Sequence, residues 1–431
     1  MHPDLIEIHR RGERPDGPLK IGSEHELLCM DSAGRVPGYH GPSGILAVLE
    51  RLQAMTNTNP TMEGDRVIGL CGPSACVTLE PGGQLELAGS PLENLHEVAD
   101  ETKAFQAMVK QVGDELGLQF FAMGLRPVAP ICRIPLMPKS RYDIMRVLMP
   151  KLGRRSIEMM FGTATVQTNL DYRSEADFAR KFRVSAGLSP IAAALFANSP
   201  YQNGRPTGRM TERYAIWDET DTDRSGRFPW MLDQGLRYED YDAWAAAQRM
   251  LFLYRDGRYI DAPERSFEAL WSEGSLDAKD WEQHLGGLFP EIRLKKILEL
   301  RSADSGCGEM VVALNAFWVG LLYDDQALAA ADAMTASWQP EAWESLAQTA
   351  ARDGLSGRSP LGSTVELSAA VLRIASAGLA RRGLDEEKYL APLQHLVDIG
   401  KSQAELLLER FEEDAAAARR FCANHLWEFP W

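Results

Sequence analysis

The chain has 431 residues, 45% of them hydrophobic and 25% charged, which is ordinary for a soluble globular protein with a large core. Its net charge of −15 argues against a general nucleic-acid binder and against a protein held on an anionic membrane. No apolar run reaches membrane-spanning length, and the N-terminus lacks the apolar core of a signal peptide. The six cysteines form no CxxC pair, so we expect a cytoplasmic protein with reduced thiols.

The N-terminal part predicts a short helix or arm over residues 1–18, followed by a strand over residues 19–28. Glu24 and Glu26 stand two apart in this strand and therefore share one face. Such a pair can line a cation site, but it can equally protect an edge strand from aggregation. Residues 43–55 have helical spacing and begin at a serine, so a helix follows.

A second pair of acids lies in the stretch LEPGGQLELAGSP, residues 79–91. Glu80 and Glu86 flank a Pro-Gly-Gly turn, and the alternation after the turn predicts a half-buried strand with Gln84 and Glu86 on one face. A glutamate that faces a cavity is costly without a partner, and Mg²⁺ is a suitable one because it takes carboxylate oxygens and leaves room for phosphate. The simpler alternative is a solvated strand face.

The next segments predict an amphipathic helix over residues 92–116 and a short strand over residues 119–124. Residues 135–149 then carry Lys139, Arg141 and Arg146 in a loop before a helix. Basic residues in such a position can bind phosphate. Salt bridging within an acidic protein is the simpler interpretation, and we favour it here.

A strand with amide side chains is expected over residues 163–171, before a helix over residues 175–197. Gln167 and Asn169 lie on the same face of this strand. Their carbonyl oxygens could bind a metal or a nucleotide, or they could be satisfied polar residues within a sheet.

Residues 200–227 predict a long loop, and loops of this length are usually functional. Arg213 in this loop could pair with a substrate carboxylate or with the acidic run that ends at Asp223. A helix over residues 238–247 and a strand over residues 251–254 follow, and an Asp-Gly pair predicts a hairpin at residues 255–260.

The last predicted strand, residues 297–304, places Glu299 and Arg301 on one face. Arg301 is a candidate phosphate ligand and Glu299 a candidate cation ligand. Residues 313–322 are apolar core, and from about residue 325 the composition predicts helices that cover the sheet. We find no repeat or linker, so residues 1–431 predict one α+β domain.

These strands carry several carboxylates and an arginine, the groups needed to bind Mg²⁺-nucleotide and to neutralise a phosphoryl group in transfer. No Walker-type loop and no GxGxxG after a strand is present, which argues against P-loop and Rossmann proteins. The motifs instead resemble the plant and proteobacterial type of glutamate–cysteine ligase over nearly the whole chain. The matching segments include GSEHE, MEGDRVIGL, LEPGGQLELAGSPLENLH, MPKSRYDIM, MMFGTATVQTNLDYRSEADFARKFR, ERYAIWDETDTDRSG and LELRSAD.

The resemblance implies the fold of the glutamine synthetase catalytic domain, in which an antiparallel sheet forms a funnel. It also implies that ATP converts L-glutamate to γ-glutamyl phosphate, which the α-amine of a small amino acid attacks. Asn169 and Arg301 resemble nucleotide and γ-phosphate contacts, with Arg301 and Glu299 as catalytic groups, and Arg213 resembles the arginine that holds the substrate glutamate. Six residues resemble the Mg²⁺ ligands of the family: Glu24, Glu26, Glu80, Glu86, Gln167 and Glu299.

The chain departs from the family pattern at segments that could reach the acceptor amino acid. Leu251 replaces a tyrosine, Gly162 replaces an arginine, and residues 308–310 lack a tryptophan and two arginines. The loss of a hydroxyl donor favours a less polar acceptor such as propargylglycine. The alternatives are an ordinary glutamate–cysteine ligase and a catalytically inactive binding protein. We expect a monomer or homodimer.

Overall fold

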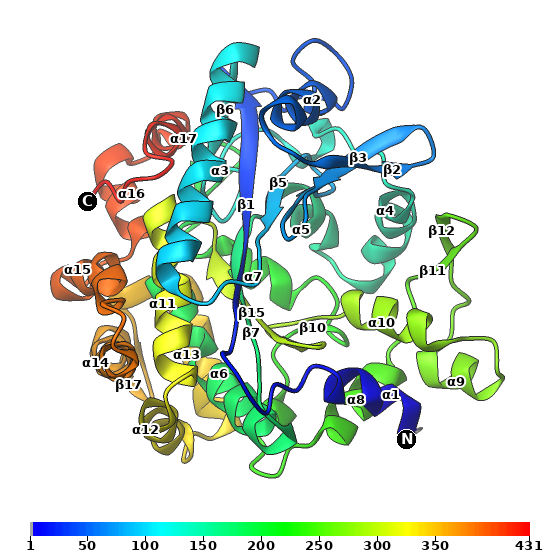
Figure 1. Ribbon diagram of the computed structural model, residues 1–431. Coiled ribbons are helices and arrows are strands. Elements are labelled where there is room, and N and C mark those ends of the chain that lie inside the picture. The colour runs from blue at the N-terminus through cyan, green and yellow to red at the C-terminus, as the bar shows by residue number, and fades with distance from the viewer. Residues whose placement is uncertain (1–2) are drawn as a thin grey trace.

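The computed structural model describes residues 3–431 and is organised around one antiparallel sheet, as expected for an α+β chain (Figure 1). The strands run in the order β14-β15-β7-β1-β5-β4-β3-β2, with β6 paired to one end of β1. Their bounds are β1 Ile21–Asp31, β2 Asn59–Glu63, β3 Arg66–Cys71, β4 Cys76–Leu79, β5 Leu85–Ala88, β6 Leu118–Phe121, β7 Thr165–Leu170, β14 Ile292–Leu294 and β15 Leu298–Asp304.

The helices enclose this sheet and make up most of the C-terminal part of the chain. The helices before β15 are α1 Pro3–Arg10, α2 Ile45–Met55, α3 Leu95–Leu116, α4 Ser140–Leu152, α5 Ser156–Gly162, α6 Glu175–Leu195, α7 Glu212–Asp218, α8 Tyr238–Ala247, α9 Phe267–Ser272 and α10 Ala278–Gly286. Those after β15 are α11 Gly308–Leu322, α12 Asp325–Thr335, α13 Pro340–Asp353, α14 Thr364–Arg382, α15 Ala391–Ile399, α16 Gln403–Phe411 and α17 Ala415–Asn424. None of the helices among residues 3–431 is long and apolar enough to cross a bilayer.

Short two-stranded pieces and single 3₁₀ turns connect these elements. The strand pairs are β8 Tyr201–Gln202 with β9 Arg205–Pro206, β10 Ser225–Gly226 with β13 Phe289–Pro290, β11 Phe252–Arg255 with β12 Arg258–Asp261, and β16 Arg358–Ser359 with β17 Gly362–Ser363. The β11–β12 pair is the expected hairpin, in which Asp256 and Gly257 both have positive φ, at 52° and 78°.

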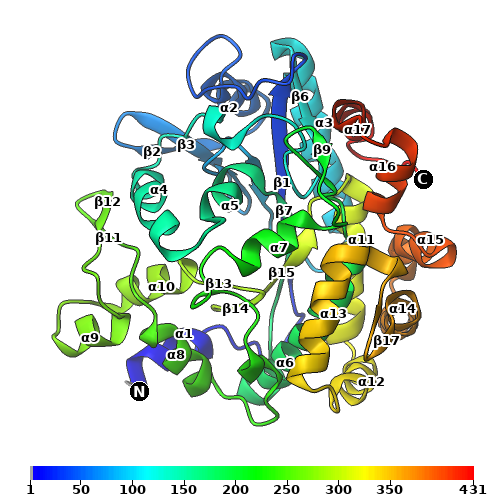
Figure 2. The same cartoon turned by 180° about the vertical axis from the view of Figure 1, so that it is seen from behind.

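The two faces of the sheet differ in polarity because side chains alternate along each strand. In β1, Glu24 and Glu26 are half-buried on one face, whereas His25 and Leu27 are buried on the other. Helices α3, α6 and α11 pack against the buried face. Figures 1 and 2 show α11 to α17 gathered on one side of β1, with β2, β3, α4 and the β11–β12 hairpin on the other. The polar face of the sheet is therefore available for a functional site.

Two predictions about local structure were wrong, and one segment was left without a prediction. The segment 200–227 is not structureless, since it contains α7, whose N-cap Thr211 accepts a hydrogen bond from the Tyr214 amide. Ser43 does not cap α2, because its hydroxyl donates instead to the Leu116 carbonyl at 2.7 Å. The segment 265–294 had no assigned structure and contains α9, α10 and β14.

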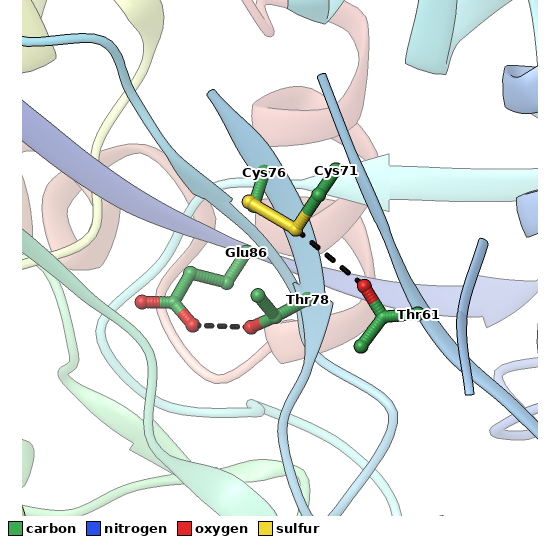
Figure 3. Close-up of a disulfide and its surroundings, with 5 residues drawn as sticks. All are labelled: Thr61, Cys71, Cys76, Thr78 and Glu86. Atoms are coloured by element: carbon green, nitrogen blue, oxygen red, sulfur yellow. Dashed lines mark hydrogen bonds between the residues drawn. A yellow bond between two sulfur atoms is a disulfide. The ribbon is translucent and has the colours of Figure 1, made fainter. Parts of the chain in front are cut away.

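The expectation of reduced thiols was also wrong, because Cys71 and Cys76 form a disulfide (Figure 3). These residues end β3 and begin β4, and the antiparallel register pairs them directly with a Cα–Cα distance of 4.2 Å. The spacing of five residues brings two cysteines together only where a tight hairpin joins them, and the hairpin is a property of the fold. Cys29, Cys132, Cys307 and Cys422 are free.

The crossing of α11 and α14 provides a test of the packing behind the sheet. A Cβ added at Gly378 would overlap the carbonyl oxygen of Gly320, a backbone atom that cannot rotate away. We therefore expect Gly378→Ala to destabilise the protein by about 2 kcal/mol or more, although alanine is the better helix former. Ala377 is exposed on the same helix, and Ala377→Gly should cost only about 1 kcal/mol. Urea unfolding measures which variant loses more of its free energy of unfolding. A Gly378→Ala variant that is more stable than wild type would contradict the close crossing of α11 and α14.

Candidate active site

A cavity of about 330 Å³ lies on the polar face of the sheet. Its floor consists of side chains from β1, β5, β7 and β15, and its walls come from α4, β11, β14 and the segment around residues 286–289. It is lined by Glu24, Glu26, Glu80, Glu86, Arg141, Tyr142, Met145, Gln167, Phe252, Gly286, Gly287, Phe289, Arg293, Lys295 and Arg301. Five of the six predicted metal ligands are in this set.

The strand register explains why these acids meet. Glu26 on β1 pairs directly with Glu86 on β5, and Glu24 pairs with Gln167 on β7. Directly opposite residues in an antiparallel pair point to the same face with their Cβ atoms about 5 Å apart. Glu80 joins them from the turn after β4. The two strands that carry paired acids in the sequence are therefore neighbours in the sheet.

The protein itself does little to neutralise the negative charges of these acids. Burial, followed by repulsion from Glu299 and Glu86, raises the pKa of Glu24 from 4.5 to about 7. Burial and repulsion from Glu80 and Glu86 raise the pKa of Glu26 well above its ordinary value, and burial and Glu80 raise that of Glu86. A bound cation would remove this repulsion and favour the ionised carboxylates.

Glu299 behaves in the opposite way because three basic side chains surround it. Lys295 Nζ lies 2.8 Å from Oε2, Arg301 Nη1 donates to Oε1 at 2.6 Å, and Arg293 Nε donates to Oε2 at 3.1 Å. Burial alone would raise the pKa of Glu299, but these cations hold it well below the ordinary value. Glu299 is fully buried and lies behind the cavity wall that Arg293, Lys295 and Arg301 form.

The two amide side chains of β7, Gln167 and Asn169, contact opposite halves of the site. Gln167 Oε1 accepts a hydrogen bond from Arg301 Nη1 at 2.7 Å. Asn169 Nδ2 donates to Glu24 Oε1 at 2.7 Å, which orients that carboxylate, but Asn169 does not line the cavity. Arg301 also lies over the ring of Trp217, 5.7 Å from its centroid. The predicted nucleotide contacts are thus held by bonds within the protein.

Basic residues of the wall were missed or undervalued in the sequence. Arg141 lines the cavity with its Nη2 3.8 Å from Glu80 Oε1, whereas Arg146 is exposed and lies 4.0 Å from Asp143, as the salt-bridge interpretation expects. Burial and the neighbouring Arg141 lower the pKa of Lys139 to about 8. Arg293 and Lys295 were not predicted at all. For Lys139 and Arg141, the available indications in the sequence were the LEPGG motif and the run of basic residues around the start of α4.

The three predicted substrate-binding residues lie outside this cavity. Arg213 is buried in α7, and its Nη2 donates to the carbonyl of Arg301 at 3.0 Å. It lines a small adjoining pocket that shares Phe289 and Arg301 with the cavity. Leu251 is buried behind Gly287, and Gly162 ends α5, where a side chain would press against Leu125 and Ile131. Neither Leu251 nor Gly162 lines the cavity.

The acids do not form a ready-made metal cage. Across residues 3–431, no three His, Cys, Asp or Glu side chains stand close enough together to hold a metal ion alone. Mg²⁺ commonly takes only one or two carboxylates, with water and substrate phosphate as its other ligands. The donor set of carboxylates and one amide oxygen therefore fits Mg²⁺ bound together with a phosphate ligand.

Comparison with known proteins identifies the family. A model described as "Glutamate-cysteine ligase family 2 (GCS2)" matches residues 20–424. The chain belongs to this family. It is 40% identical over 415 residues to the chloroplastic glutamate–cysteine ligase of Arabidopsis thaliana, covering 95% of this chain and 79% of that protein. Glutamate–cysteine ligase B of Oryza sativa subsp. japonica is 39% identical over 416 residues, covering 95% and 84%.

Solved structures agree on the fold of this family member. The glutamate–cysteine ligase of Francisella tularensis in complex with AMP has a TM-score of 0.55 at 11% identity, covering 97% of this chain and 91% of that one. A bifunctional glutathione synthetase from Pasteurella multocida has a TM-score of 0.53 at 13% identity, covering 98% and 54%. The predicted family, its fold and an ATP-dependent ligase as the enzyme class are confirmed.

The predicted cytoplasmic location was wrong. The relatives matched over 95% of the chain are named as chloroplastic enzymes. Composition and cysteine spacing do not determine the compartment in which a protein works.

The repulsion at Glu24 predicts a pH-dependent gain in stability for a neutral variant. Between pH 4.5 and about 7 the folded chain keeps a proton on Glu24 that the unfolded chain releases, so rising pH destabilises the folded ligase. Glu24→Gln keeps the acceptor for Asn169 and removes this cost. We expect it to stabilise the metal-free protein by on the order of 2 kcal/mol at pH 8 and far less at pH 5.

Thermal unfolding in EDTA at the two pH values measures this effect. Glu268→Gln, at an exposed residue of α9, is the control and should leave both melting temperatures unchanged. An equal shift of the Glu24→Gln melting temperature at pH 5 and pH 8 would show that Glu24 carries no repulsion.

Proposed function

We propose that this protein joins the γ-carboxylate of L-glutamate to the α-amine of L-cysteine at the expense of ATP. One observation carries the proposal: acids and basic side chains from separate strands face one another across a single cavity. The family and the names of its plant relatives support cysteine as the acceptor. The AMP bound to the related Francisella enzyme supports a nucleotide site.

The acidic half of the cavity would hold Mg²⁺, which supplies charge neutralisation for the phosphates of the nucleotide. We assign Glu24, Glu26, Glu80, Glu86 and Gln167 to this role. Glu299 remains a proposed ligand, although its oxygens are bonded to basic residues. Asn169 orients Glu24 and is a proposed nucleotide contact.

The basic half of the cavity would act on the phosphoryl group in transfer. Arg301 presents its guanidinium to the cavity, and Glu299 and Gln167 fix its orientation. The γ-carboxylate of glutamate attacks the γ-phosphorus of ATP, and ADP leaves with an acyl phosphate formed. Preorganised positive charge stabilises the negative charge spread over the phosphoryl oxygens.

The second half-reaction needs no nucleophilic side chain from the protein. The unprotonated α-amine attacks the acyl carbon, inorganic phosphate leaves, and the amine loses a proton as the amide forms. The enzyme contributes positioning, which removes the entropic cost of bringing the reactants together. Arg213 is a proposed anchor for a carboxylate of glutamate, since its pocket adjoins the cavity at Arg301.

The departures from the family pattern give little support to a less polar acceptor. Leu251 and Gly162 are buried outside the cavity. Gly308, in place of the family tryptophan, begins α11, where an added Cβ would overlap the ring of Trp427 from the C-terminal segment. None of residues 308–310 lines the cavity. We therefore propose cysteine as the acceptor, with residues 1–431 acting as one catalytic unit in a monomer or homodimer.

An acceptor panel tests the reaction. Purified protein with L-glutamate, ATP and MgCl₂ receives cysteine, propargylglycine, 2-aminobutyrate, serine or alanine in turn, and ADP release and dipeptide mass are measured. We expect γ-glutamylcysteine, with kcat/KM for cysteine the highest of the series. A preference for propargylglycine would overturn the acceptor, and no ADP release with any acceptor would overturn the enzyme.

The role of the basic wall is tested at neighbouring lysines. Lys295 lines the cavity and contacts Glu299, whereas Lys296 points outward to Glu282 at 3.0 Å. We expect Lys295→Met to lower kcat/KM for ATP by about tenfold or more, because one preorganised positive charge is lost. Lys296→Met is the matched control and should remain within about twofold, as expected for an exposed ion pair. Equal effects of both variants would exclude a specific role for Lys295.

A further inference from the structure

A buried cluster of hydrogen bonds lies where β15 meets α7, next to the small pocket that Arg213 lines (Figure 2). At its centre is Asp304, the last residue of β15, which is 1% exposed. Its Oδ2 accepts hydrogen bonds from the Asn198 amide at 2.8 Å and the Ser199 hydroxyl at 2.7 Å, and its Oδ1 accepts one from the Thr211 hydroxyl at 2.9 Å. Asp304 does not line the cavity, and a carboxylate buried at this depth is costly unless it has a task.

The two hydroxyl partners of Asp304 belong to the backbone that leads into α7. Thr211 is the N-cap of this helix, and its hydroxyl accepts from the Tyr214 amide at 3.2 Å while it donates to Asp304. The Ser199 hydroxyl likewise accepts from the Arg213 amide at 3.1 Å while it donates to Asp304. Asp304 therefore holds the first turn of α7, in which Arg213 is the second residue.

Asp304 also faces the side chain of Arg213. Arg213 Nη1 lies 4.0 Å from Asp304 Oδ1, and Nη2 donates to the Arg301 carbonyl at 3.0 Å. Burial lowers the pKa of Arg213, and Asp304 opposes this more strongly than any other acid, ahead of Glu26 in the cavity. Within the part of the chain that the structure describes, the buried Nε of Arg213 has no hydrogen-bond partner. This donor is therefore available to the carboxylate of a ligand.

Close backbone packing fixes the position of Asp304. A Cβ added at Gly124 would lie 2.2 Å from Asp304 Cγ, so the Gly124 backbone closes one side of the carboxylate. The Gly124 amide donates to the Asn198 carbonyl at 3.0 Å, and its own carbonyl accepts from the Ala164 amide at 3.0 Å. On β7, Thr165 pairs with Asp304 in the sheet. The carboxylate is thus a fixed point against which Arg213 is oriented.

A fixed acid is needed at this point because the cavity contains another acid that attracts Arg213. Glu26 is repelled by Glu80 and Glu86, and the charge of Arg213 lowers its pKa against that repulsion. Arg213 is 2% exposed, so water screens these attractions little. Without the charge of Asp304, the guanidinium would be drawn toward the acidic half of the cavity. Asp304 therefore keeps Arg213 at the adjoining pocket.

We propose that Asp304 is a positioning residue, which holds Arg213 in the orientation that binds a carboxylate of the substrate glutamate. The inference rests on the proposed function in taking Arg213 as the anchor for glutamate. Because Asp304 does not line the cavity, it acts through Arg213 and not on the nucleotide. Loss of its charge should weaken the binding of glutamate and leave the binding of ATP unchanged.

Asp304→Asn tests this role, because asparagine keeps the size and one acceptor oxygen and removes the charge that faces Arg213. We expect KM for glutamate to rise about tenfold or more, with KM for ATP within about twofold of wild type. Asp242→Asn is the matched control, since Asp242 is equally buried but is bonded to His9 at 2.7 Å in another part of the fold. It should leave both KM values within about twofold, even where it lowers the melting temperature. Equal rises of both KM values in Asp304→Asn would overturn the positioning role.

A pair of variants at Thr211 provides a second test that leaves Asp304 itself intact. Thr211→Val removes one hydroxyl that joins α7 to Asp304, whereas Thr211→Ser keeps it. We expect Thr211→Val to raise KM for glutamate about threefold and Thr211→Ser to restore a value near wild type. A glutamate KM in Thr211→Val equal to that of wild type would contradict the role of this cluster.

Direct binding separates this inference from the proposed function. The dissociation constant of L-glutamate in the presence of MgADP is measured by calorimetry for wild type, Arg213→Lys, Asp304→Asn and the double variant. We expect each single variant to bind about tenfold or more weakly, and the double variant to match Arg213→Lys within about twofold, because both changes act on one group.

The other outcomes of this measurement each overturn a different statement. Weaker binding in Arg213→Lys alone would overturn the inference and leave Arg213 as the anchor. Losses that add up in the double variant would show that Asp304 acts independently of Arg213, which would also overturn the inference. The same affinity in all four proteins would overturn the proposed anchor and the inference together.

Discussion

The site depends on one geometric constraint, the two-residue alternation of side chains in an antiparallel sheet. Across the four strands β15, β7, β1 and β5, the polar members of each register pair point to the same face: Glu299 with Asn169, Gln167 with Glu24, and Glu26 with Glu86. The opposite members, such as Leu27 and Leu85, are buried against helices. A slip of one residue would send the acids into that core and the leucines into the cavity. Burial of the apolar face therefore fixes which side chains face the cavity.

The charges on this face are separated, and the separation has consequences for binding. Glu299, behind the cavity wall, is ion-paired with Arg293, Lys295 and Arg301, and its pKa is held low. Glu24, Glu26 and Glu86 face one another instead, and their pKa values are raised. One half of the cavity thus contains uncompensated repulsion between carboxylates, and the other half contains preorganised positive charge. In the proposed function, a cation bound to an anionic phosphate would satisfy both halves at once, and such a cation takes only part of its ligands from the protein.

The sequence predicted the site residues where polar and apolar residues alternate over several positions. It did not predict those that come from short elements. The strands with Glu24 and Glu86 were predicted because their polar and apolar residues alternate over several positions. Arg293 lies in β14, which has three residues and gives no periodicity. Arg141 and the exposed Arg146 both lie in α4 and have the same local appearance in the sequence, so only the fold distinguishes them. The disulfide required the register of β3 and β4, which cysteine spacing does not contain.

The departures from the family pattern show that the effect of a substitution cannot be inferred without knowing whether the residue lines the cavity or packs in the core. Leu251 was expected to change the acceptor because it replaces a tyrosine, but it packs in the core behind Gly287. At Gly308 the space next to the backbone is filled by Trp427, a residue more than one hundred positions later in the sequence. The amides of Gly308 and Glu309 donate to the carbonyls of Leu426 and Trp427, at 2.9 and 3.0 Å, which fixes that segment against α11. The altered motif at residues 308–310 is therefore matched by the C-terminal segment packed on α11, and the cavity itself keeps the charged residues on which the proposed phosphoryl transfer depends.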